Sequence, residues 1–174
     1  EMDRISVLVD ELLLLARFES QKEAVKIEAV NINTVLIDII SRNSVAFEDK
    51  NMKLNIIVPN ELFVNSDAYM LTIVLENLIS NALKYSFEEG TIIVTGSGST
   101  GKVLLEIEDF GVGIPTGDIG KVFNSFYRSR PEETTVTGSG LGLSITRRIC
   151  ELLNIEISIK SELNRGTKIT LAFP

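Results

Sequence analysis

The first twenty residues carry apolar side chains three or four positions apart, which is the spacing of one helical face. Ile5, Leu8, Leu12 and Leu15 belong to this face, and acidic and basic residues take other positions. The pattern predicts an amphipathic helix over residues 2–20 with too much apolar surface to stand alone. Such a helix is either a core helix of the same domain or half of a helical hairpin that dimerises. The polar stretch that follows favours the hairpin.

The remaining residues predict further helices, together with strands that neighbour one another in pairs. The expected helices cover residues 33–48, with Asn33 as N-cap, 67–85, beginning at Asp67, and 138–153. The expected strands cover residues 26–30, 51–58, 61–64, 91–96, 102–108, 155–160 and 167–173, and residues 96–101 are expected to form a flexible hairpin loop. In the first of these helices the expected core residues are Val35, Leu36, Ile39, Ile40 and Val45. This order predicts an α+β fold in which helices cover one face of an antiparallel-rich sheet, and it argues against a Rossmann domain.

Composition limits the chemistry available to the chain. Its 174 residues are 44% hydrophobic, carry a net charge of −7 and include no histidine. An acidic protein of this kind is not expected to bind nucleic acid. The one cysteine, Cys150, lies in an apolar helical pattern, so a buried structural thiol is expected, and little remains for a zinc site or a catalytic triad. The chemistry must rest on carboxylates, amides, lysine, arginine and the backbone.

No signal peptide or membrane-length apolar run is visible. The chain opens in the middle of a helical pattern, without a cap residue. We therefore expect it to be a fragment of a longer protein.

Two glycine clusters are candidate ligand-binding segments. The first, residues 109–113, follows a predicted strand and begins with Asp109, whose carboxylate can accept a hydrogen bond from the amino group of a base. The second, residues 138–143, leads into a predicted helix, and the free N–H groups of a helix N-terminus suit a phosphate. Residues 116–137 lie between them and are expected to form a mobile lid over a nucleotide. The aromatic and basic residues of that segment include Phe123, Phe126, Arg128 and Arg130. The glycines could instead serve only tight packing of helix against sheet.

The helix predicted over residues 67–85 has one apolar and one polar face. Asn77, Asn81 and Lys84 lie four and then three positions apart, so they share the polar face. An amide oxygen suits Mg²⁺, and an ammonium group can neutralise a phosphate. A solvated polar stripe is the alternative. The residues expected on the buried side are Leu71, Val74, Leu75, Leu78, Ile79 and Ala82.

Together these segments resemble the conserved boxes of the bacterial sensor histidine kinases. The corresponding segments are residues 77–85 for the N box, 109–113 for the G1 box, 122–128 for the F box and 138–143 for the G2 box. They occur in the order of the family, and the flanking pattern fits its catalytic ATP-binding domain over residues 23–174. Residues 1–22 resemble the second helix of its dimerisation hairpin. The sequence departs from the family at Asn124, where an acid is usual, and at Met70 and Ile73, where arginine and glutamine are usual.

The resemblance implies a Bergerat-type α/β sandwich that binds ATP and Mg²⁺. It implies that Asn81 holds the metal, that Asn77 and Lys84 line the phosphates, and that Asp109 receives the adenine amino group. Arg128 or Arg130 would lie near the γ-phosphate, so the implied catalytic residues are Asn77, Lys84, Arg128 and Arg130. The implied nucleotide-binding residues are Asn77, Asn81, Lys84, Tyr85, Asp109, Gly111, Gly113, Ile114, Phe123, Gly138, Ser139, Gly140, Leu141, Gly142 and Leu143.

The resemblance also implies an activity and partners. The family transfers the ATP γ-phosphate to a histidine on its dimerisation hairpin, and from there to an aspartate of a response-regulator receiver domain. A homodimer and a cytoplasmic domain are implied, and anchoring of the whole protein in the inner membrane is left open. Since this chain has no histidine, we expect it to bind ATP and hardly consume it. The alternatives are a related ATPase, which would need an acid at Asn77 to activate water, and a scaffold that binds nucleotide without transferring it.

Overall fold

The computed structural model describes residues 2–20, 25–99, 101–129 and 138–174. Its helices are α1 (Met2–Glu19), α2 (Ile32–Arg42), α3 (Ser44–Asp49), α4 (Ala68–Tyr85) and α5 (Gly142–Leu152). Its strands are β1 (Glu28–Asn31), β2 (Lys53–Ile57), β3 (Phe63–Ser66), β4 (Thr91–Ser99), β5 (Lys102–Asp109), β6 (Glu156–Glu162) and β7 (Gly166–Phe173). The predicted elements are therefore present, with the differences described below.

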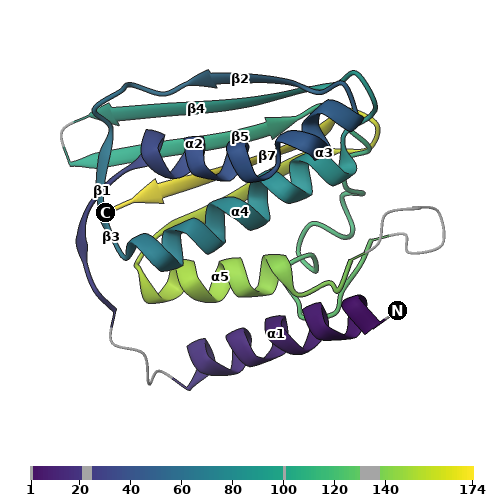
Figure 1. The fold of residues 1–174 in the computed structure, drawn as a ribbon, viewed down its shortest axis with the longest axis horizontal. Helices are drawn as coiled ribbons and strands as arrows, with labels where there is room; N and C mark the ends of the chain where they lie inside the picture. The colour runs from purple at the N-terminus through teal and green to yellow at the C-terminus, as the bar shows by residue number, and fades with distance from the viewer. Residues whose placement is uncertain (1, 21–24, 100, 130–137) are drawn as a thin grey trace.

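The main sheet has the strand order β2-β4-β5-β7-β6, and a separate two-stranded sheet pairs β1 with β3. Only β2 and β4 run parallel within the main sheet, and its other neighbours are antiparallel. Helices α2, α4 and α5 lie on one side of this sheet (Figure 1). This two-layer arrangement confirms the predicted α+β fold with a mixed, largely antiparallel sheet.

Helix α4 is the central element of the helical layer. Asp67 caps it, because its Oδ1 accepts a hydrogen bond from the Met70 N–H at 3.0 Å, as the sequence predicts. Its apolar side chains recur at helical spacing and are buried against the sheet and the other helices. The predicted core residues on this face are confirmed: Leu71, Val74, Leu75, Leu78, Ile79 and Ala82. The polar side of the same helix is thereby left for the site.

Several predicted boundaries are wrong. Asn31 rather than Asn33 caps α2, since its side chain accepts from the Thr34 N–H at 3.2 Å. The expected single helix breaks at Asn43, so Val45 is 67% exposed and Phe47 is buried in its place. Residues 96–99 continue β4 rather than forming a loop, because they pair with β5 along its full length. The last helix begins at Gly142, after residues 138–141 have formed a loop.

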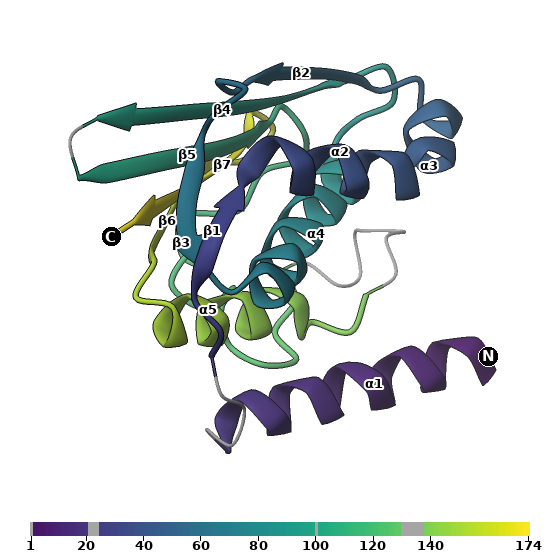
Figure 2. The ribbon, with the colours of Figure 1, turned by 60° about the vertical axis from the view of Figure 1, so that its left-hand side comes forward.

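Helix α1 lies against α5 (Figures 1 and 2). Phe18 is fully buried in the domain core, and its carbonyl oxygen accepts a hydrogen bond from Arg148 Nε at 3.3 Å. The opposite side of α1 is exposed and apolar, through Ile5, Val9, Leu12 and Leu13. The helix therefore combines a packed face with an uncovered one, and its role in a dimerising hairpin stays a prediction. Within the described residues, no helix is both long and apolar enough to cross a membrane.

Candidate functional site

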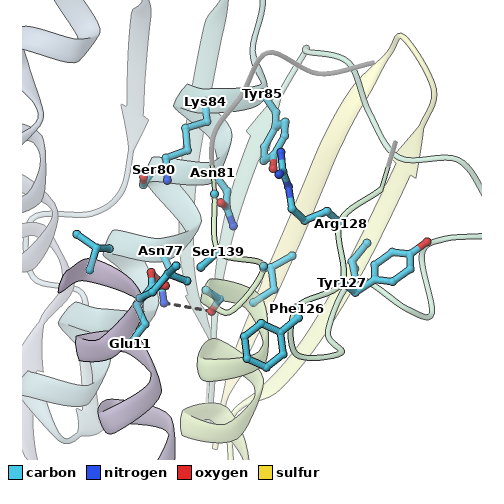
Figure 3. Close-up of a pocket in the computed structure, with 17 residues that line it drawn as sticks. Glu11, Asn77, Ser80, Asn81, Lys84, Tyr85, Phe126, Tyr127, Arg128 and Ser139 are labelled. Atoms are coloured by element: carbon cyan, nitrogen blue, oxygen red, sulfur yellow. Dashed lines mark hydrogen bonds between the residues drawn. The ribbon is translucent and has the colours of Figure 1, made fainter. Parts of the chain in front are cut away.

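The main cavity has a volume of about 800 Å³ and lies beside the polar face of α4 (Figure 3). Four segments enclose it: α4, the turn segment after β5, the loop that precedes α5, and α1. The residues that line it are Val7, Leu8, Glu11, Asn77, Ser80, Asn81, Lys84, Tyr85, Val122, Phe126, Tyr127, Arg128, Gly138, Ser139, Gly140, Gly142 and Leu143. Three of the four predicted boxes thus meet around one hollow.

The polar face of α4 forms one wall of the cavity. Asn77, Ser80, Asn81 and Lys84 follow each other at helical spacing, so they project to the same side. Asn77 Nδ2 donates to the Gly142 carbonyl at 3.1 Å and to Thr146 Oγ1 at 3.4 Å. This pair of bonds fixes the N box against the start of α5.

Glu76 points away from the cavity. Its Oε1 accepts from Asn43 Nδ2 at 2.7 Å, and its Oε2 lies 3.4 Å from an Arg42 guanidinium nitrogen. These bonds tie α4 to the end of α2. Glu76 immediately precedes Asn77, the position of a hydrolytic base in related ATPases. Its carboxylate is bound to Asn43 and Arg42 and does not face the cavity.

The loop before α5 forms the facing wall. Ser139 Oγ accepts from the Leu141 N–H at 3.1 Å, and the Gly140 carbonyl accepts from the Phe126 N–H at 2.9 Å. Leu141 itself is fully buried, so its side chain belongs to the core. Because Gly142 opens α5 and lines the cavity, the N-terminal end of this helix faces the hollow, and such an end favours an anion.

Asp109 lies at the end of β5, is only 7% exposed and does not line the cavity. Its Oδ1 accepts from the Gly111 N–H at 2.9 Å. Burial raises the pKa of Asp109 to about 6, against the lowering effect of hydrogen bonds from the Gly111 and Thr167 backbone. This carboxylate is thus largely withdrawn from water, and a donor from a ligand would relieve the cost of its charge.

The glycines that follow Asp109 are required by packing within the protein. A Cβ at Gly111 would collide with the Tyr85 carbonyl, and one at Gly113, whose φ is +63°, would collide with the Glu162 carbonyl. The Val112 N–H donates to the Tyr85 carbonyl at 3.0 Å. The end of α4 and the first glycine cluster are therefore in direct contact, and approach of a base to Gly113 stays a prediction.

Other predicted site residues lie elsewhere. Phe123 lines a shallower hollow of about 300 Å³ between α1 and α5, with Leu15 and Arg148. The Ile114 N–H donates to Ser161 Oγ at 2.8 Å, beside the β6–β7 turn. Arg128 lines the main cavity, whereas Arg130 and the rest of the predicted lid to residue 137 lie outside the described residues.

The prediction missed several residues that line the cavity. Ser80 could have been found, because it lies on the same helical face as Asn77 and Lys84. Val122 and Tyr127 belong to the F box and were not expected to contact ligand. No signal in the sequence places α1 here, so its contributions could not be foreseen: Val7, Leu8 and Glu11.

Comparison with known proteins agrees with this geometry. Residues 66–174 match the family described as histidine kinase-, DNA gyrase B- and HSP90-like ATPases. Since the match spans more than half of the chain, the chain belongs to this ATPase family. More narrowly, the chain is similar to proteins named as sensor kinases and to solved histidine kinase structures.

Two relatives and two solved structures illustrate the likeness. The chain is 33% identical to the sensor protein kinase WalK of Staphylococcus haemolyticus and 32% to the sensor protein BceS of Halalkalibacterium halodurans, covering all of this chain and 29% and 52% of theirs. Full-length ShkA in complex with AMPPNP has a TM-score of 0.85 at 24% identity, over 99% of this chain and 36% of that one. Histidine kinase ThkA in complex with the response regulator TrrA has a TM-score of 0.78 at 26% identity, over 100% and 48%. The chain thus spans about half or less of these relatives.

Proposed function

We propose that this domain binds ATP with Mg²⁺ and provides the γ-phosphate for transfer to a histidine of a dimerisation hairpin. One observation carries the proposal. The amide and ammonium groups of α4 and the start of α5 face each other across one cavity of about 800 Å³. That arrangement offers both a metal-binding oxygen and a phosphate-binding helix end in one place.

Each part of the nucleotide has a candidate partner. Lys84 and the backbone N–H groups near Gly142 would neutralise the phosphates, with Arg128 on the opposite wall. Asp109 would accept a hydrogen bond from the adenine amino group, which compensates its burial. Tyr85, the last residue of α4, lines the cavity, and its carbonyl accepts a hydrogen bond from the Val112 N–H. It would border the ribose or the base.

The donor set of the cavity fits a magnesium ion. Asn81 would hold it through the amide oxygen, since Mg²⁺ prefers hard oxygen ligands and is usually shared with substrate phosphates. When bound, the metal would neutralise charge on the β- and γ-phosphates. Among the described residues, no cluster of three or more acidic, histidine or cysteine side chains offers a metal site without nucleotide.

Transfer would require little covalent chemistry from this chain. A histidine nitrogen attacks the γ-phosphorus, the bond to the bridging oxygen breaks, and ADP leaves with the electron pair. Phosphoryl transfer depends mainly on an in-line nucleophile and on neutralised charge. The cavity would supply the groups that neutralise charge, and the hairpin histidine would supply the nucleophile.

Hydrolysis is the weaker alternative for this site. Asn77 has no proton-accepting group of suitable basicity, and its Nδ2 is already bound to Gly142 and Thr146. Glu76 is held by Asn43 and Arg42, away from the cavity. A water molecule near the γ-phosphate would therefore have no carboxylate from α4 to activate it.

The receiver domain of a response regulator is the proposed final acceptor. ThkA, which is 26% identical and shares the fold at a TM-score of 0.78, has been solved with such a regulator. We further propose that residues 1–22 belong to the hairpin and 23–174 to the catalytic domain. The exposed apolar side of α1 supports dimerisation, because a partner helix would remove it from water.

Labelling with γ-³²P ATP tests the transfer. The 174-residue chain alone should stay unlabelled and release phosphate at close to background, because it contains no histidine. Fusion of a histidine-bearing hairpin helix ahead of residue 1 should produce a label that is acid-labile and alkali-stable. Rapid phosphate release by the chain alone would favour an ATPase. ATP binding without any label in the fused protein would favour a nucleotide-binding scaffold.

A further inference from the structure

Helix α1 presents one continuous face to the domain. Phe18 is buried in the core, Leu14 and Leu15 pack against it, and Val7, Leu8 and Glu11 line the cavity. These positions recur at intervals of three and four, as one helical face requires. Glu11 lies at the centre of this face, and every other residue in the set is apolar. A carboxylate is uncommon at a partly buried position among apolar residues, so its presence calls for an explanation.

One carboxylate oxygen of Glu11 has no hydrogen-bond partner among the described residues. This oxygen, Oε2, is also enclosed. Lys84 lines the same cavity, yet the two side chains do not form an ion pair. An enclosed carboxylate oxygen without a partner destabilises the protein. Oε2 of Glu11 is therefore available to a ligand in the cavity, because no described group of the protein binds it.

Nucleotide binding would bring further negative charge into the cavity beside the Glu11 carboxylate. Glu11 and Asn77 project into the hollow from opposite elements, α1 and α4, and Asn81 and Ser80 continue the α4 wall (Figure 3). If phosphates occupy this hollow, a second negative group in it is repelled unless a cation lies between them. Carboxylate, amide and hydroxyl oxygens are the ligands that Mg²⁺ accepts.

We propose that Glu11 supplies a carboxylate oxygen, directly or through one bound water, to the divalent cation that accompanies the nucleotide. The proposal rests on the proposed function, because it takes the cavity to be the nucleotide site. It makes α1 part of the metal–nucleotide site, so that the position of this helix and the occupancy of the cavity depend on each other. A carboxylate would then favour the metal complex and disfavour metal-free ATP.

The test measures ATP affinity of the 174-residue chain by calorimetry, once with Mg²⁺ and once with a chelator. Glu11→Gln keeps the shape of the side chain and removes its charge, and Glu11→Ala removes the oxygens. Both should weaken Mg²⁺–ATP binding roughly tenfold or more, and Glu11→Gln should tighten metal-free ATP. Asp10→Asn is the matched control, because it removes the same charge from an exposed position of the same helix, and it should change neither value.

Mn²⁺ in place of Mg²⁺ gives a second measurement. Electron paramagnetic resonance of the ATP-bound metal should differ between wild type and Glu11→Gln, with Asp10→Asn like wild type. Tighter binding of ATP by Glu11→Gln in both the metal and the chelator arms would overturn the proposal, since it would make Glu11 a simple electrostatic barrier. Unchanged affinities would also overturn it. Failure of the wild-type chain to bind ATP under either condition would instead refute the proposed function itself.

Discussion

Replacing Asp109 by asparagine should make the domain more stable near neutral pH while weakening its hold on ATP. The pKa of this carboxyl is raised from 3.8 to about 6 by burial. Between these values the unfolded chain gives up its proton while the folded chain keeps it, so stability falls as the pH rises through this window. A rise of about 2 units at roughly 1.4 kcal/mol each amounts to about 3 kcal/mol.

The variant removes this pH-dependent cost. In the wild type, Asp109 Oδ1 accepts from the Gly111 N–H at 2.9 Å, and the oxygen of the asparagine amide can still accept this bond. The amide nitrogen of asparagine, however, cannot accept the hydrogen bond that the Thr167 backbone donates to the wild-type carboxylate. That lost bond costs about 1–2 kcal/mol at every pH. The difference in unfolding free energy between Asp109→Asn and wild type should therefore shift by about 2–3 kcal/mol in favour of the variant between pH 4 and pH 7.

Urea unfolding at intervals of one pH unit measures this shift. Asp38→Asn, which removes an exposed carboxylate on α2, is the control and should follow the wild type. Calorimetry at pH 7 should show the opposite effect on ligand binding. Asp109→Asn should bind ATP about 1–3 kcal/mol more weakly than the wild type does. A stability difference that stays constant across the pH range would refute the argument from buried charge. Equal affinity of the wild type for ATP and GTP would refute the assignment of Asp109 to the adenine amino group.

Two further predictions concern α4. Asn81→Ala should markedly reduce the Mg²⁺-dependent part of ATP affinity, because it removes the amide oxygen proposed to bind the metal. Titration of ATP with and without Mg²⁺ measures this, and a metal dependence like that of wild type would contradict the prediction. Lys50→Met should lower the unfolding free energy by about 1.5–3 kcal/mol, because Lys50 Nζ donates to the carbonyls of Leu83, Lys84 and Ser86 at 2.9, 3.0 and 3.1 Å. Chemical denaturation measures that loss, and a change below about 0.5 kcal/mol, as for an ordinary surface substitution, would show that these bonds are not stabilising.

The parts of the fold that the sequence predicts are those set by local periodicity. Helix α4 is correct from cap to end because Asp67 and its apolar stripe act within a few residues of each other. The break at Asn43 was not predictable in the same way, since the apolar spacing runs on through Val45. There the decisive contacts are distant ones: Asn43 Nδ2 bonds to Glu76 on α4, and Phe47 enters the core.

The glycines near the site show a similar limit of prediction from the sequence. The sequence indicates that the backbone comes close to something near Gly111 and Gly113, and a nucleotide was the expected neighbour. In the structure the close neighbours are the Tyr85 and Glu162 carbonyls. Since steric freedom is all that a glycine contributes, its presence cannot say whether a ligand or another part of the chain approaches.

Helix α1 is the clearest case of a contribution that depends on tertiary packing. The structure divides its apolar residues between a packed side and an exposed side, and periodicity alone does not say which side meets the domain. Burial of Phe18 settles the choice, and two turns away along the same face it places Glu11 in the cavity. A single buried side chain thus decides whether a carboxylate reaches the proposed phosphate site. Movement of α1 that withdraws Phe18 would withdraw Glu11 as well, so the charge in the cavity and the docking of this helix cannot change independently.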